Sequence, residues 1–157
     1  METKIDALIN KMEQSRAKLN TALEKIAPQA EIYPSWKLKQ VLDHISGWDE
    51  LVITSLRAYL HGEIPERRVK NIDQYNAGSV SARKALTLEQ SRQAFDTSRQ
   101  EVIHILRELP AAMLAQKYKA PWGGQCTISS IVRIFVSHEQ EHAKQIEEIL
   151  NIPPTNH

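Results

Sequence analysis

The length and charge of the chain bound what it can be. Its 157 residues suit one domain with a substantial hydrophobic core. Twenty lysines and arginines nearly balance 19 aspartates and glutamates, so we expect no broad basic field for nucleic acid or an anionic membrane. No apolar stretch could span a bilayer or serve as a signal peptide, which predicts a cytoplasmic protein. With Cys126 as the only cysteine, any metal must be bound by histidine and carboxylate.

The apolar residues recur with a helical period, and no segment alternates for long enough to predict a strand. The first helix is expected over residues 3–26, ending ahead of Pro28 because the residue before a proline avoids helical geometry. The second follows Pro34, with Ser35 as its N-cap, and ends at Gly62. Both helices carry one apolar face, as expected for helices that pack in a core.

A long connection separates the second helix from the third. It covers residues 62–86, and a short helix can begin after Asp73. Thr87 and Gln90 have the spacing of a capping box, which predicts the start of the third helix there and its end at Pro110. A connection of this length can cross a bundle from end to end, so spacing alone leaves the helix order open.

The fourth helix is predicted to begin after Thr127 and to end near Asn151, following a loop over residues 110–126. The glycine-poor, leucine- and alanine-rich composition agrees with helices throughout. We therefore expect an all-α protein, with residues 1–157 forming a single four-helix bundle domain with long crossover connections.

Two histidines lie on the apolar stripe of the fourth helix. Ile131 and Phe135 precede His138 and His142, and Ile146 continues the same face. Histidines four residues apart present both rings on one side of a helix, at the spacing of metal ligands. His138 and His142 are therefore candidate ligands.

His44 occupies the equivalent stripe of the second helix, between Val41 and Trp48. His104 lies on a polar helix face and His61 at a helix end, so we interpret both as ordinary surface residues. A single buried histidine usually hydrogen-bonds a neighbour, but three inward histidines would each need a partner. One divalent cation satisfies all three, and a three-histidine set leaves a fourth position open, as catalytic zinc sites do.

The carboxylates near these histidines are weaker candidates for functional residues. The sequence His138 to His142 fits the zinc-protease pattern H-E-x-x-H with Glu139 as base, but no strand is predicted that would align a peptide. Glu139 stays a weak candidate base, with a solvated helix carboxylate as the alternative. Asp43 and Asp49 do not share the stripe of His44, so we expect them at the surface or, at most, supporting a ligand.

Two segments together carry a family resemblance. WKLKQVLDHISGWD, from Trp36 to Asp49, is similar to the W-S-x-K-x-x-L-x-H-L-x-x-W segment of the DinB/YfiT-like superfamily of metalloenzymes, and HEQEHAKQI, from His138 to Ile146, resembles its closing H-x-x-x-H-x-x-Q-I. The residues NIDQYN at 71–76 also resemble a branch with self-resistance and hydrolase roles, which often lacks that closing pair. The resemblance implies a four-helix bundle that holds zinc, nickel or a similar divalent ion on His44, His138 and His142.

The resemblance also suggests an activity, since family members include thiol-dependent transferases and isomerases. It implies a metal-dependent enzyme that transfers or adds a low-molecular-weight thiol to a small electrophile. A metal with an open position equally activates water, so a metal-dependent hydrolase remains an alternative. A second alternative is a non-catalytic, metal-stabilised bundle that forms a homodimer. In each case we expect a small-molecule ligand or another copy of the chain as partner, and neither nucleic acid nor membrane.

Overall fold

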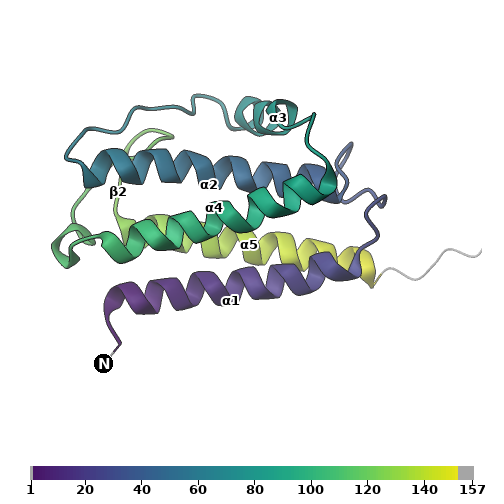
Figure 1. Cartoon of the computed structure of the whole chain (residues 1–157), viewed down its shortest axis with the longest axis horizontal. Coiled ribbons are helices and arrows are strands. Elements are labelled where there is room, and N and C mark those ends of the chain that lie inside the picture. Colours follow the sequence, from purple (N-terminus) through teal and green to yellow (C-terminus); the bar gives the residue numbers. More distant parts are fainter. Residues whose placement is uncertain (1, 152–157) are drawn as a thin grey trace, which may run out of the picture. The chain divides into compact units, whose positions relative to one another are not determined.

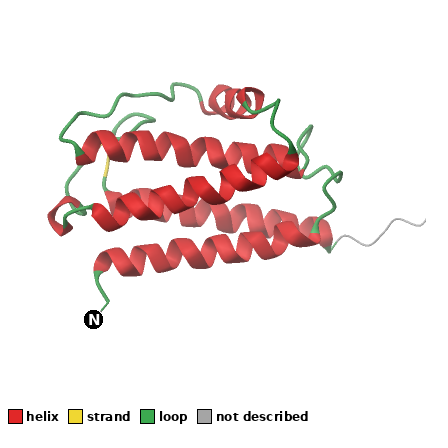
Figure 2. Ribbon diagram, viewed as in Figure 1, coloured by secondary structure: helices red, strands yellow, loops and turns green. Residues whose placement is uncertain are grey.

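The computed structural model describes residues 2–151 and is all-α, as predicted (Figures 1 and 2). Its elements in chain order are α1 (Lys4–Lys25), α2 (Leu38–Leu60), α3 (Ile72–Ala82), α4 (Leu88–Glu108), the 3₁₀ helix η1 (Ala111–Met113), β1 (Tyr118–Lys119), β2 (Gln125–Cys126) and α5 (Ile128–Leu150). The short helix predicted in the crossover is α3. Among the described helices, none has the length and apolar character needed to cross a membrane.

Two of the three predicted N-caps are confirmed. Thr87 and Gln90 form the capping box of α4, and the Thr127 hydroxyl accepts from the Ser130 amide at 3.1 Å at the start of α5. The N-cap predicted for α2 was wrong, because the helix begins at Leu38 and Ser35 lies in a turn with a φ of 68°. The Ser35 amide donates to Glu31 at 2.7 Å, so Ser35 belongs to the turn that precedes the helix.

The described chain divides into two compact units. The first contains residues 2–38 and 132–151, which supply α1, the loop after it and most of α5. The second contains residues 39–131, with α2, α3, α4, the β1–β2 hairpin and the first turn of α5. Each has apolar side chains with almost no exposed surface. In the first unit these include Ile9, Met12, Leu19 and Ile146, and in the second Val52, Leu56, Val102 and Leu106.

In the second unit, α2 and α4 run in the same direction. Asp43 on α2 accepts from Ser91 at 2.6 Å, and Asp49, further along α2, accepts from Ser98 at 2.8 Å. Because the partners advance together along both helices, the helices are parallel, and the chain must return along their length between them. The connection over residues 61–87, with α3 inside it, makes this return (Figure 1).

The hairpin in the loop before α5 was not predicted. Tyr118 pairs with Cys126, and the turn between the strands uses Gly123 and Gly124 at φ values of 101° and 73°, a region that glycine adopts without steric penalty. Strands of two residues show no period-2 pattern, which is why the sequence did not reveal them. The hairpin packs through Tyr118, whose ring stacks on that of Tyr59 with centroids 4.2 Å apart.

Candidate functional site

His138 and His142 lie side by side on α5. Their ring centroids are 4.3 Å apart, as expected for residues four apart on one helix face. His142 is buried and His138 is half-buried. Burial lowers the pKa of His138, although the Glu139 carboxylate acts in the opposite sense. The lower pKa favours the neutral imidazole, which is the form that binds a metal.

Tyr33, in the loop between α1 and α2, is a partner of this pair that the sequence analysis missed. Its hydroxyl lies 2.6 Å from Nδ1 of His142 and hydrogen-bonds Oε1 of Gln145. The loop is held by a backbone bridge between Tyr33 and Trp36. Burial, and secondarily the Glu141 charge, raises the pKa of Tyr33 to about 12. The hydroxyl therefore stays protonated at neutral pH, and a loop tyrosine offers no periodic signal by which sequence could find it.

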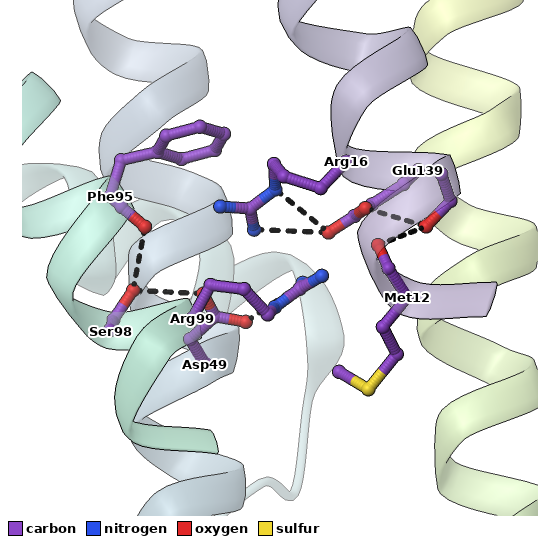
Figure 3. A network of polar contacts seen from close by, with 8 residues as sticks. Met12, Arg16, Asp49, Phe95, Ser98, Arg99 and Glu139 are labelled. Atoms are coloured by element: carbon purple, nitrogen blue, oxygen red, sulfur yellow. Dashed lines mark hydrogen bonds and ion pairs between the residues drawn. The ribbon is translucent and has the colours of Figure 1, made fainter. Parts of the chain in front are cut away.

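The Glu139 carboxylate points toward α1 and is fully engaged there (Figure 3). Oε1 accepts from the Arg16 guanidinium at 3.0 Å, and Oε2 accepts from Ser15 at 3.0 Å. Glu139 is only 2% exposed, so the alternative of a solvated helix carboxylate was wrong. A buried carboxylate held by an arginine and a hydroxyl connects two helices of the first unit, and its use as a base stays a prediction.

His44 lies on α2 in the second unit and is buried, as its place on the apolar stripe predicted. Asp43 beside it is 1% exposed and accepts from Lys39 at 2.7 Å as well as from Ser91. The expectation of a surface Asp43 was therefore wrong. The helical wheel of α2 alone places Asp43 in solvent. In the folded protein, α4 brings the Ser91 hydroxyl to this position, so the carboxylate is buried with a hydrogen-bond partner.

Asp49, six residues later on α2, repeats this arrangement (Figure 3). It is 1% exposed, receives the Ser98 hydroxyl, and pairs with Arg99 at 3.2 Å. The prediction of a surface position is again corrected. The sequence signal that could have indicated it is the run Ser98-Arg99 on α4, a donor pair on an otherwise apolar helix face.

Aromatic side chains gather on α2 one turn beyond His44. The Trp48 ring lies 5.1 Å from that of Tyr75 and 6.2 Å from that of Trp122, centroid to centroid. Trp48 donates to the Asn76 side chain at 2.8 Å, and the Tyr75 hydroxyl donates to the carbonyl of Gly47 at 2.6 Å. Both α3 residues come from the NIDQYN stretch. α3 and the loop before β2 thus place an aromatic wall along this part of α2.

His61 and His104 agree with their interpretation from sequence, and Cys126 is a packed residue. His104 is exposed and lies 3.2 Å from Glu108 one turn later on α4. The His61 side chain contacts the Arg57 carbonyl near the end of α2. Cys126 is buried, and burial raises the pKa of its thiol while the Tyr118 hydroxyl acts in the opposite sense. A raised thiol pKa fits a packed side chain better than a nucleophile.

A groove of about 510 Å³ lies between α1 and α5 in the first unit. Lys11 and Lys18 of α1 and Arg133 of α5 line it, together with the amide side chains of Gln14 and Gln140. No acidic side chain is among the residues that line the groove. The near balance of charge over the whole chain therefore conceals a local excess of positive charge.

Comparisons with known proteins identify a family. A model of the DinB superfamily matches residues 11–146, which include both α5 histidines and His44. No curated protein sequence matches the chain.

Solved structures with the same fold agree with this match. The colibactin self-resistance protein ClbS, in complex with double-stranded DNA, aligns over 96% of this chain and 97% of its own with a TM-score of 0.78 and 16% identity. YfiT from Bacillus subtilis, described as a probable metal-dependent hydrolase with an unusual four-helix bundle topology, aligns over 93% of this chain and 85% of its own (TM-score 0.71, 19% identity). At such identities the likeness establishes the fold, and the predicted bundle is confirmed.

A third solved structure is larger than this chain. The mycothiol-dependent maleylpyruvate isomerase aligns over 92% of this chain with a TM-score of 0.76 and 10% identity, and the chain spans 61% of that protein.

The DNA in the ClbS structure contradicts one expectation. We expected no nucleic-acid partner from the balanced charge, yet a protein of the same fold is seen with double-stranded DNA. The error lies in using a sum where the local distribution matters, because a phosphate contact depends on nearby cations and not on the total charge. The groove lined by Lys11, Lys18 and Arg133 is such a local concentration.

Proposed function

Because the chain belongs to the DinB superfamily, we propose that it is a metal-dependent enzyme in which His44, His138 and His142 bind one divalent ion. The observation that carries the proposal is the α5 pair, two adjacent imidazoles of which one has its Nδ1 beside the Tyr33 hydroxyl. Ligating histidines in proteins use one ring nitrogen for the metal and the other for a hydrogen bond of this kind. His44 offers a third ring nitrogen from α2.

The donor set suits zinc or nickel. Three neutral imidazoles are borderline ligands that these ions accept, whereas calcium and magnesium prefer oxygen. The lowered pKa of His138 keeps that ring neutral. A three-histidine set also leaves room for an exchangeable ligand, which distinguishes a catalytic site from a closed structural one.

We infer that the substrate is a small electrophile and that the enzyme acts in the cytoplasm. A divalent ion held by three imidazoles supplies a full double charge that lowers the pKa of a thiol or a water molecule bound beside it. Among the protein's own residues, Tyr33 orients one proposed ligand, because its hydroxyl lies beside Nδ1 of His142. Transfer of a low-molecular-weight thiol is the preferred reaction, and hydrolysis is the alternative.

Metal binding is tested by stoichiometry. Metal-free protein titrated with zinc or nickel should bind one ion per chain, and His138→Ala should abolish stoichiometric binding. His104→Ala is the matched control, since His104 is an exposed helix histidine in contact with Glu108. Equal loss in both variants would refute the assignment of ligands.

The reaction is tested with a panel of electrophiles, with and without added thiol. Turnover that requires both metal and thiol supports transfer. Turnover with metal and water alone would replace transfer by hydrolysis. If neither occurs in protein that binds metal, the three histidines serve folding, as in the non-catalytic alternative.

A second candidate function is binding of double-stranded DNA along the groove between α1 and α5. ClbS has this fold and is seen with such DNA, and the groove combines three cations with amide and hydroxyl donors. The lysines of α1 also recur every seven residues, which places them on one face with a drift of only about 20° per repeat. They are Lys4, Lys11, Lys18 and Lys25. The resulting stripe continues past both ends of the groove, so it offers further cations to a phosphate backbone.

The salt dependence of DNA affinity tests this candidate. A Lys11→Gln, Lys18→Gln, Arg133→Gln triple variant should bind a short fluorescent duplex more weakly, and the slope of log affinity against log salt should fall by roughly 2 to 3 units because each phosphate contact contributes about 0.9. The control removes the same charge elsewhere, through glutamine at Lys70, Lys84 and Lys117. Equal losses in the two variants, or no binding at low salt, would exclude the groove as a DNA site.

A further inference from the structure

A chain of four polar side chains ends at the His142 ring in the first unit. The Gln145 amide nitrogen Nε2 donates to Oε1 of Glu141 at 3.1 Å. Oε1 of Gln145 accepts from the Tyr33 hydroxyl, and that hydroxyl lies 2.6 Å from Nδ1 of His142. Glu141 and Gln145 lie one turn apart on α5, while Tyr33 comes from the loop after α1.

The direction of each hydrogen bond follows from the charge at one end. The ionised Glu141 carboxylate can only accept, so the Gln145 amide must turn its NH₂ toward it and its oxygen toward Tyr33. An amide oxygen only accepts, so the single hydroxyl proton of Tyr33 goes to Gln145. The Tyr33 oxygen then faces Nδ1 of His142 as an acceptor, and Nδ1 must carry the proton.

We propose that Glu141, Gln145 and Tyr33 form a relay that selects the Nδ1–H tautomer of His142 and so presents the Nε2 lone pair for coordination. This inference rests on the proposed function for its purpose, since a ligand role gives the tautomer its importance. The tautomer itself follows from the contacts alone. Tyr33 and Gln145 are positioning residues, because they act through His142.

The opposite direction of the Tyr33–His142 hydrogen bond is incompatible with the same contacts. If Tyr33 donated its proton to Nδ1 of His142, its oxygen would face the Gln145 oxygen without a proton between them. Rotating the Gln145 amide to avoid this would turn its oxygen toward the Glu141 carboxylate, again placing two acceptors together. One arrangement satisfies all three contacts, and it protonates Nδ1.

Nitrogen-15 spectra of the metal-free protein test the relay directly. Long-range proton–nitrogen correlations at pH 8, where imidazole is neutral, distinguish the two tautomers, and comparison with His142→Gln assigns the signals. Wild-type His142 should show the Nδ1–H form. Tyr33→Phe should shift it toward the Nε2–H form that a free imidazole favours, and should weaken metal binding by about 10- to 100-fold. Tyr59→Phe, which removes a tyrosine hydroxyl in the second unit that donates to the Met113 carbonyl, should change neither.

The outcomes separate the relay from the proposed function. An Nε2–H form in wild type, or an unchanged tautomer in Tyr33→Phe, overturns the relay even if metal binds. The predicted tautomer in a wild-type protein that binds no metal supports the relay and refutes the metal site. Because the His142 ring signals can also be assigned in wild type, through correlations that connect the ring to its own backbone, the relay is tested even if a substitution prevents folding.

Discussion

Glu139 is a side chain for which a structural role and a catalytic role can be distinguished. It follows a candidate ligand directly and matches the glutamate of a zinc-protease motif, yet both carboxylate oxygens accept hydrogen bonds from α1. A buried ion pair contributes little beyond its desolvation cost, but removing one partner leaves the other charge poorly compensated. We therefore expect substitution of Glu139 to lower the stability of the fold.

Substituting Glu139→Gln should lower the free energy of unfolding of the metal-free protein by about 2–3 kcal/mol, because a charged hydrogen bond to Arg16 is lost in a buried setting. Urea denaturation measures this. The control is Glu147→Gln on the same helix, which is exposed and should change stability by less than about 0.5 kcal/mol. An unchanged stability with lost turnover would instead restore Glu139 as the base.

At this scale the sequence predicted which histidines are buried or half-buried but did not predict the residues around them. The positions of His44, His138 and His142 on apolar helix faces were predicted because a helical wheel reports which face of a helix is apolar, and their role as metal ligands stays a prediction. Asp43, Asp49 and their hydroxyl partners on α4 could not be found this way, since a buried polar residue is decided by what another helix brings to it. Tyr33 was missed because loop positions have no period.

At the scale of elements, the predicted helices match those observed to within a few residues, since caps and prolines are local signals. The parallel order of α2 and α4 was not predictable, because a connection of this length permits either direction. The close approach of α3 to α2 also depends on one local choice. A Cβ added at Gly47 would lie 2.3 Å from Oγ of Ser79, so only glycine fits there.

Two glycine substitutions should therefore have opposite effects. Gly47→Ala should lower the unfolding free energy by about 1–3 kcal/mol through overpacking against α3. Gly78→Ala, on α3 itself, meets no atom within 4 Å and should raise stability by roughly 0.5–1 kcal/mol through helix propensity. Thermal unfolding of the two variants beside wild type gives both values. Destabilisation by both would contradict the expected gain in helix propensity at Gly78.

At the scale of the whole molecule, stability should fall in alkaline solution. Burial raises the pKa of all four tyrosines, to about 12 for Tyr33 and in direction for Tyr59, Tyr75 and Tyr118. The sign follows from linkage: between pH 10 and 12 the native state holds more protons than the unfolded chain, so the unfolding free energy falls as pH rises. The contribution is complete below pH 10, the value for free tyrosine.

Urea midpoints measured from pH 8 to pH 11 should therefore stay level at first and then fall above pH 10. Tyr33→Phe has no hydroxyl to ionise at that position and should show a smaller fall than wild type. A fall of equal size in the variant would mean that other groups, and not this tyrosine, set the alkaline limit.

The proposed metal site makes its strongest prediction at this scale, because its proposed ligands come from helices that are far apart in the sequence. His44 lies on α2, and His138 and His142 lie on α5. An ion that binds only the native arrangement stabilises it by about 2.7 kcal/mol at a free concentration one hundred times its dissociation constant. For a chain of this size the unfolding midpoint should then rise by roughly 5 to 10 °C. His44→Ala should lose this rise as completely as His142→Ala does, whereas His104→Ala should keep it. A rise that survives in His44→Ala would confine the metal to the α5 pair and remove α2 from the site.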